Sequence, residues 1–233
     1  MSALLKLKQV TAEIGVAGET CILDLSGAIY LPDRATLLVA DLHLEKGSSF
    51  ARKGQLLPPY DTRETLAILT EAIDRFRPNA VVALGDSFHD LGGPDRLCGD
   101  DCGALAALQA GRDWTWITGN HDPAVPDRVG GRVTEEIALG GLMLRHQPQA
   151  GAAFEIAGHL HPVGKVAMRG RSVRRRCFVT DGRRLVMPAF GAYAGGLNAC
   201  DAVFKPLFLD GFTAHLIGDG RLFAIGRSML CRD

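Results

Sequence analysis

The sequence lacks several features that would assign it to other classes of protein. It has no apolar run of the roughly 18 residues that a membrane helix requires, so no membrane span is expected. Its first residues lack the apolar core and cleavage site of a signal peptide, so a cytoplasmic location is predicted. Lys plus Arg and Asp plus Glu both number 26, so the formal net charge is zero. A nucleic-acid partner would therefore be held by local basic patches rather than by a global field.

Paired cysteines of the kind that build disulfide frameworks or thiolate metal sites are also missing. Of the six cysteines only Cys98 and Cys102 lie close in sequence, and no second pair accompanies them. Reduced thiols are expected in a cytosolic protein of this size. With 233 residues, 47% of them hydrophobic and 22% charged, the chain can bury a sizeable core without staples. A single domain over residues 1–233 is predicted.

The pattern of apolar runs changes near the middle of the chain. The first half alternates expected strands with expected helices. The strands are expected at 11–16, 20–25, 28–31, 36–40, 80–84 and 114–118. The helices are expected at 61–76 and 103–110. Asp61 is the expected cap of the longer helix, with Glu64 as its capping-box partner. The second half is rich in short runs of strand type, at 132–137, 142–144, 154–157, 165–168, 176–180, 184–187, 203–209 and 212–217. Two sheets packed face to face, with helices outside, are predicted.

Polar residues follow four of the buried runs directly. They form the segments Asp41-Leu42-His43, Gly85-Asp86, Gly119-Asn120-His121-Asp122 and Gly158-His159-Leu160-His161. In an extended segment residues i and i+2 point to the same face, so Asp41 with His43, or His159 with His161, can bind one ion together. The carboxyl ends of strands are where open α/β sheets bind ligands. Imidazole and carboxylate groups without thiolate suit Mn²⁺, Fe or Zn²⁺ better than Ca²⁺ or Mg²⁺.

The ordered set of motifs resembles the calcineurin-like metallophosphoesterases. Within them the sequence is similar to the bacterial ligase-associated DNA damage response endonucleases, a likeness that rests on residues 38–47 (LVADLHLEKG) and 188–198 (PAFGAYAGGLN). The resemblance implies an α/β (α+β) fold, a four-layer αββα sandwich of two mixed sheets flanked by helices. It also implies two divalent metal ions, with Mn²⁺ favoured and Fe or Zn²⁺ as alternatives.

The resemblance assigns roles to individual residues. One ion would be bound by Asp41, His43, Asp86 and His161, and the other by Asp86, Asn120, His146 and His159, with Asp86 bridging the two. His121 would be the general acid or a residue that contacts the phosphate, rather than a ligand. Two such ions lower the pKa of a bridging water, so that hydroxide attacks the phosphate while His121 protonates the departing alkoxide. Asp122 has two interpretations of equal weight, namely orienting the His121 imidazole or capping a helix before Pro123.

Contacts with substrate are less sharply indicated. His89 either touches substrate or makes a hydrogen bond within its own loop. A run of arginines, namely Arg169, Arg171, Arg174, Arg175 and Arg176, either contacts a DNA backbone or decorates a solvated hairpin. The favoured function is a DNA phosphodiesterase in bacterial repair, acting beside an ATP-dependent DNA ligase, a helicase and an exonuclease. The alternatives are a nucleotide or cyclic-nucleotide phosphoesterase and, less favoured, a non-catalytic scaffold.

Overall fold

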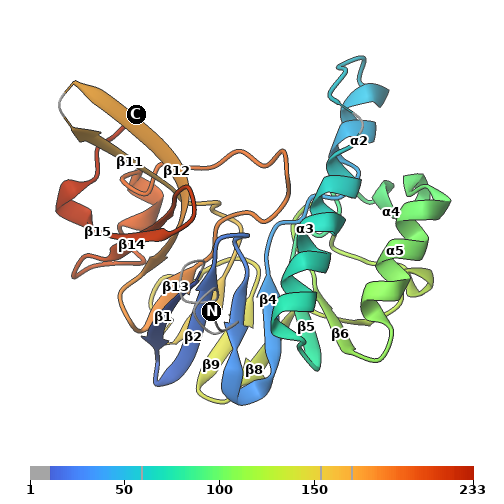
Figure 1. Ribbon diagram of the computed structural model, residues 1–233, viewed down its shortest axis with the longest axis horizontal. Coiled ribbons are helices and arrows are strands. Elements are labelled where there is room, and N and C mark those ends of the chain that lie inside the picture. Colours follow the sequence, from blue (N-terminus) through green and yellow to red (C-terminus); the bar gives the residue numbers. More distant parts are fainter. Residues whose placement is uncertain (1–10, 59, 153, 169) are drawn as a thin grey trace, which may run out of the picture.

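The computed structural model describes residues 11–58, 60–152, 154–168 and 170–233, so Arg169 and the first ten residues lie outside the described residues. Two β-sheets form the body of the molecule (Figure 1). The first contains β1 (Thr11–Val16), β2 (Glu19–Asp24), β3 (Ile29–Leu31), β4 (Thr36–Val39), β5 (Ala80–Leu84), β6 (Asp113–Ile117) and β7 (Arg132–Thr134), in that order. The second contains β8 (Glu136–Leu139), β9 (Leu142–Arg145), β10 (Glu155–Ala157), β11 (Val163–Met168), β12 (Arg171–Thr180), β13 (Arg184–Val186), β14 (Thr213–Ile217) and β15 (Leu222–Gly226).

Both sheets are mixed, as the resemblance implied. In the first, β1 to β4 pair antiparallel, whereas β4 to β7 pair parallel. In the second, β10 pairs parallel with both β9 and β13, while the remaining pairs are antiparallel. Parallel pairing brings the carboxyl ends of β4, β5 and β6 to one edge, and those of β9 and β10 to one edge of the other sheet. The segments with the predicted metal ligands follow these ends.

The alternation of side chains along β4 shows why these strands are apolar on both faces. Leu37 and Val39 pack with α3 and α5, whereas Leu38 and Ala40 pack between the two sheets. Ile156 and Phe178 meet Leu38 in that layer from the second sheet. A strand buried on both sides reads as a continuous apolar run, as the sequence indicated.

Among the described residues, the α-helices lie only on the outer side of the first sheet. They are α2 (Lys46–Arg52), α3 (Asp61–Phe76), α4 (Gly93–Arg96) and α5 (Gly99–Gln109). The range predicted for α3 is correct, but Asp61 is its first residue and not its cap. The Asp61 carboxylate instead accepts a hydrogen bond from the backbone amide of Gly47 and ties α2 to α3. α2 and α4 escaped prediction because each is too short to display a helical period.

The outer face of the second sheet packs against a thinner layer. The 3₁₀-helix η3 (Ala202–Phe204) and its flanking turns cover Cys177, Val179 and Leu216. The strand predicted at 203–209 is therefore wrong, because its apolar residues are spaced to pack a 3₁₀-helix and turns against a sheet. Three further 3₁₀-helices are η1 (Pro32–Arg34), η2 (Asp127–Val129) and η4 (Arg227–Met229).

Two connections also differ from prediction. The single run expected at 132–137 breaks at Glu135, where the chain leaves the edge of the first sheet as β7 and joins the edge of the second as β8. The hairpin of β11 and β12, here called the hairpin arm (Val163–Arg176), extends away from the sheets in Figure 1. Among the described helices, none combines the length and apolarity that crossing a membrane demands.

Candidate metal centre

The pairing of β4 with β5 continues past the ends of both strands. The amide of Asp41 donates to the carbonyl of Gly85, that of His43 to Asp86, and that of Leu44 to Ser87, at 3.2, 2.9 and 2.9 Å. The loops after β4 and β5 are therefore held side by side by backbone hydrogen bonds. For this reason the predicted ligands on the two loops lie close together.

Five of the predicted ligands have left-handed backbone conformations that ordinary residues avoid. They are Asp41, His43, Asp86, His159 and His161, with φ between 45° and 69°. Each such conformation costs of order 1 kcal/mol and persists only where surrounding contacts hold it. In this chain the left-handed conformation turns the side chains of these ligands toward a common point. The backbone strain is therefore located at the predicted metal centre.

One cluster gathers Asp41, His43 and His161, whose ligand atoms all lie within 4.8 Å of one another. The Nε2 atoms of His43 and His161 are 3.3 Å apart, and His161 Nε2 lies 3.0 Å from Asp41 Oδ1. His161 Nδ1 faces the carbonyl oxygen of Gly195 at 3.2 Å, a contact that orients the ring through its other nitrogen.

A second cluster gathers Asp86, His146 and His159. His146 Nε2 lies 3.4 Å from Asp86 Oδ2, 3.1 Å from His159 Nδ1 and 3.0 Å from Asn120 Oδ1. His146 Nδ1 donates to the carbonyl of Leu84 at 2.9 Å, which leaves Nε2 as the ligand atom. Five separate loops thus bring all seven predicted ligands into two adjoining clusters.

Glycines in these loops leave room for the ligands. A Cβ on Gly85, whose φ is 76°, would come within 2.5 Å of the His146 ring. A Cβ on Gly119 would collide with Oδ1 and the backbone nitrogen of Asp86. The close backbone approach expected of these glycines is therefore observed, and the space that a side chain would fill holds a metal ligand.

The donor set fits divalent ions. Asp41 and Asp86 are 0% and 2% exposed, and among the described residues their ion-pair partners are histidines rather than lysine or arginine. Burial, with the neighbouring His161, lowers the pKa of His43 to about 3 and keeps its imidazole neutral, the form that binds metal. Burial would raise the pKa of Asp86, but its hydrogen bond with His146 lowers that pKa to about 2. Burial would lower the pKa of both His146 and His161, but the hydrogen bond with Asp86 raises the pKa of His146 to about 9, and that with Asp41 raises the pKa of His161. These two imidazoles would therefore release a proton when they bind a metal ion.

His121 lies beside the first cluster, with its ring centroid 5.1 Å from that of His43. Its Nδ1 is 2.8 Å from the carbonyl oxygen of His89. The two rings are also stacked, with centroids 5.1 Å apart. The loop hydrogen bond considered for His89 thus runs through its carbonyl, while its imidazole joins His43 and His121 in a third group of histidines.

Neither interpretation of Asp122 is correct. Its Oδ2 accepts the backbone amides of Ser87 and Phe88 at 2.7 and 3.0 Å, and its Oδ1 accepts that of Gly119 at 3.0 Å. The carboxylate therefore joins two loops of the centre and does not orient His121. No helix begins at Pro123 in this described stretch, so the capping role is also wrong. Sequence reasoning missed this cross-loop role because its partners lie about 35 residues away.

The arginines of the hairpin arm divide into two kinds. Arg176 is partly buried and donates to the carbonyl of Ala189 at 2.7 Å, so its role is structural. Arg174 donates to the carbonyl of Gly196 at 2.8 Å with 44% of its side chain exposed, and Arg175 and Arg171 are exposed. The exposed members belong to β12, and Arg174 reaches the loop that orients His161.

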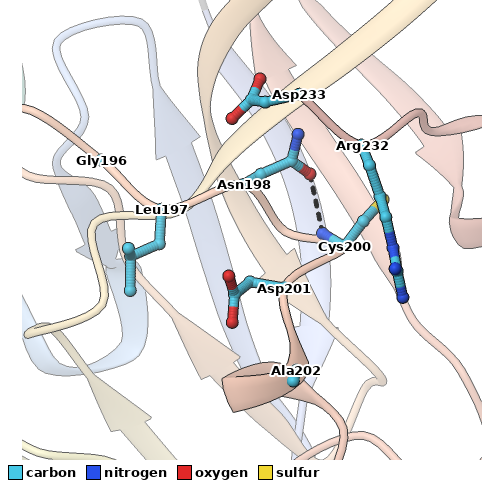
Figure 2. A pocket seen from close by; sticks show the side chains of 8 residues that line it. All are labelled: Gly196, Leu197, Asn198, Cys200, Asp201, Ala202, Arg232 and Asp233. Atoms are coloured by element: carbon cyan, nitrogen blue, oxygen red, sulfur yellow. Dashed lines mark hydrogen bonds between the residues drawn. The ribbon is translucent and has the colours of Figure 1, made fainter.

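A cavity of about 360 Å³ lies behind that loop, between residues 196–202 and the last two residues of the chain. Figure 2 shows Asp201, Asp233 and Arg232 around it, with Asn198 joined to the amide of Cys200. Two carboxylates beside one guanidinium give no excess positive charge for a phosphate. The rim of the metal centre is the better place for a phosphate, because Asn120 is exposed there and His121, His159 and His161 are partly exposed.

Comparison with solved structures agrees with this geometry. The chain is similar to the crystal structure of the nuclease MPE from Pseudomonas putida, with a TM-score of 0.72 and 29% identity over 92% of this chain and 100% of that one. It is also aligned with YfcE, a phosphoesterase from E. coli, at a TM-score of 0.41 and 13% identity over 83% of this chain and 98% of that one, a likeness too weak to add to the argument.

No protein-family model and no curated protein matches the chain. The similarity to the nuclease extends over almost the whole chain and includes the fold. The predicted fold of two mixed sheets with helices is therefore confirmed, and the similarity agrees with the resemblance that the sequence motifs indicated.

Proposed function

We propose that this chain is a two-metal phosphodiesterase that hydrolyses DNA. The observation that carries the proposal is the convergence of all seven predicted ligands, from five loops, next to His121. Asp41, His43, Asp86 and His161 would hold one ion, and Asp86, Asn120, His146 and His159 the other, with Mn²⁺ as the favoured metal. Two such ions, when bound, neutralise the phosphate and supply an activated water.

His121 is the proposed general acid. A carbonyl oxygen only accepts hydrogen bonds, so the contact with His89 places a proton on Nδ1 of His121. Nε2 then gives a proton to the departing oxygen from the doubly protonated imidazolium, which is left neutral with its remaining proton on Nδ1. General acid catalysis of this kind is worth about 10² to 10⁴ in rate.

DNA is the proposed substrate for two reasons. The whole chain is similar to a protein described as a nuclease. The centre also reaches the surface beside the hairpin arm, whose exposed Arg171 and Arg175 suit the phosphates of a polymer that extends beyond the site, while Arg174 there pairs with Asp233. A role in repair, and partnership with a ligase, a helicase and an exonuclease, remain predictions from the resemblance.

The test is hydrolysis by metal-stripped protein with and without added Mn²⁺. Bis-p-nitrophenyl phosphate would be the first substrate and a circular DNA the second, with Asp86→Ala as the blank. Turnover of both substrates that requires Mn²⁺ and is missing from the blank is expected. Turnover of the small diester without DNA cleavage would favour the nucleotide or cyclic-nucleotide alternative. No turnover despite bound metal would overturn the enzymatic proposal in favour of a scaffold.

A further inference from the structure

A network of polar side chains joins the loops next to the predicted metal ligands and takes no part in the predicted metal binding. Its members are Glu45, Ser48, Thr62, Asp90 and Arg96, called here the Arg96 network. They come from the loop after β4, from α2, α3 and α4, and from the loop after β5. No sequence motif indicates this network, because members as far apart as Glu45 and Arg96 meet only in the folded chain.

The contacts of the network run in an unbroken series. Glu45 is buried, and its two carboxylate oxygens accept the hydroxyls of Thr62 and Ser48 at 2.9 and 2.6 Å. Arg96 Nε donates to Ser48 Oγ at 2.8 Å, and the guanidinium grips both oxygens of Asp90 at 2.8 and 3.0 Å. Such a bidentate ion pair fixes the orientation of the Asp90 carboxylate as well as its distance from Arg96.

Arg96 and Asp90 form a charge-assisted pair in which Arg96 is largely buried and the Asp90 side chain is 39% exposed. Burial would raise the pKa of Asp90, but hydrogen bonds from Arg96 and Ser49 outweigh it and lower the pKa to about 2. The Arg96 side chain is only 14% exposed, so solvent competes little for its donors.

The series ends at the peptide bond that holds His121. The carbonyl oxygen that faces His121 Nδ1 belongs to His89, and this carbonyl is part of the peptide unit that joins His89 to Asp90. The same loop is anchored on its other side, since the amide of His89 donates to the carbonyl of Leu44 at 2.9 Å. Gripping Asp90 therefore fixes the orientation of the acceptor that sets the proton position on His121.

We propose that Arg96, through Asp90, is the positioning residue of the acid His121. This inference rests on the proposed function, since it assigns an origin to the orientation of the proposed acid. Arg96 touches neither the metal ligands nor a substrate in this arrangement. It acts by holding the 89–90 peptide unit, whose displacement would release Nδ1 of His121 and misdirect Nε2.

The test compares Arg96→Ala with Arg128→Ala. Arg128 is a matched control because it pairs with Asp95, the neighbour of Arg96 in α4, at an exposed position. Two aryl diesters, one with a good and one with a poor leaving group, would be hydrolysed by each variant after Mn²⁺ content and melting temperature are measured. His121→Ala would be run in parallel.

Arg96→Ala is expected to lower kcat about tenfold more for the poor leaving group than for the good one, with unchanged Mn²⁺ content. His121→Ala should show the same pattern more strongly, and Arg128→Ala should show none. Arg96→Lys keeps the charge without the fork and is expected to recover part of the loss. Equal losses on both diesters in Arg96→Ala would overturn the inference, whereas a His121→Ala variant insensitive to leaving group would overturn the proposed acid itself.

A second measurement does not depend on activity. The His121 Nδ1 proton, held by a carbonyl, should give a sharp imidazole resonance in ¹⁵N-labelled protein, assigned by its loss in His121→Ala. The resonance is expected to broaden or vanish in Arg96→Ala and, if that variant folds poorly, in the milder Asp90→Asn. A sharp resonance retained in both variants would contradict the positioning role.

Discussion

The metal centre and the hairpin arm are both polar regions, yet the chain builds them in opposite ways. In the centre, side chains such as Asp41 and Asp86 are buried, sit on left-handed backbone and are crowded by glycines that cannot take a Cβ. In the arm, Arg171 and Arg175 stand exposed on a regular strand. Ligand geometry needs atoms fixed to a fraction of an ångström, whereas attraction of a polyanion needs only charge nearby.

This difference predicts large, all-or-none effects in the centre and small, salt-dependent effects in the arm. The same difference distinguishes two neighbouring arginines, because Arg176 is partly buried and bonded to a backbone carbonyl, whereas Arg175 is exposed to solvent. The predictions below test the contrast, beginning with the largest effect.

Removing Asp86 should give the largest effect. Asp86→Ala is expected to abolish both metal occupancy and turnover, because the residue is the proposed bridge between two ions and its carboxylate also accepts the amide of His121 at 2.9 Å. Metal analysis of the purified variant, beside that of the native protein, is the measurement. Two ions per chain in the variant would contradict the bridging assignment.

Removing His121 should affect rate and not metal content. His121→Ala is expected to keep both ions and to lose about 10² to 10⁴ in kcat on diesters with poor leaving groups. Steady-state kinetics with metal analysis would check this. An unchanged rate on such substrates would count against the acid role of His121. It would also weaken the contrast between the metal centre and the hairpin arm, because a residue of the crowded centre would then be dispensable.

A pair of glycine substitutions tests crowding directly. In Gly119→Ala the new methyl group meets Asp86, so we expect a loss of about 1–3 kcal/mol in unfolding free energy together with weaker Mn²⁺ binding. Gly103→Ala lies in α5 with open space around the added group and should gain about 0.5–1 kcal/mol. Denaturant unfolding of both variants, with and without Mn²⁺, measures the difference. Similar stabilities would refute the crowding argument.

The smallest effect is expected in the arm. Arg175→Ala should weaken DNA binding a few-fold and reduce the salt dependence of binding by about one counterion, with hydrolysis of bis-p-nitrophenyl phosphate unchanged. The control is Arg132→Ala, at the start of β7 and so away from the carboxyl ends of the parallel strands. DNA-binding titrations at several salt concentrations would measure this effect. If the affinity of the two variants fell equally steeply with salt concentration, the hairpin arm would not contact the DNA.

The fold was predictable where a regular spacing of apolar residues ends at residues that are typical of turns. The ranges of β1, β5 and α3 were predicted without error, because each is a run of consistent period bounded by glycine, proline or a charged residue. Short elements such as α2 escaped prediction, and residues 203–209 were assigned to the wrong structure. In those places burial against a neighbour, rather than local preference, decides the conformation.

The metal centre was predictable for a related reason. Asp41 and His43, or His159 and His161, follow buried strands directly, so the sequence places them at strand ends, and the order of the motifs carries the resemblance. What Asp122 binds could not be read in the same way, because its partners are backbone amides of a distant loop.

The sequence by itself indicated which residues are the predicted metal ligands, through local spacing after buried strands and through the resemblance that the order of the motifs carries. Only the tertiary structure decided how those residues are held. The carbonyl behind His121, the amides around Asp122 and the grip of Arg96 on Asp90 are contacts between segments that the fold alone brings together. The physical reason is that a ligand's chemistry resides in its own side chain, whereas its orientation is set by neighbours across space.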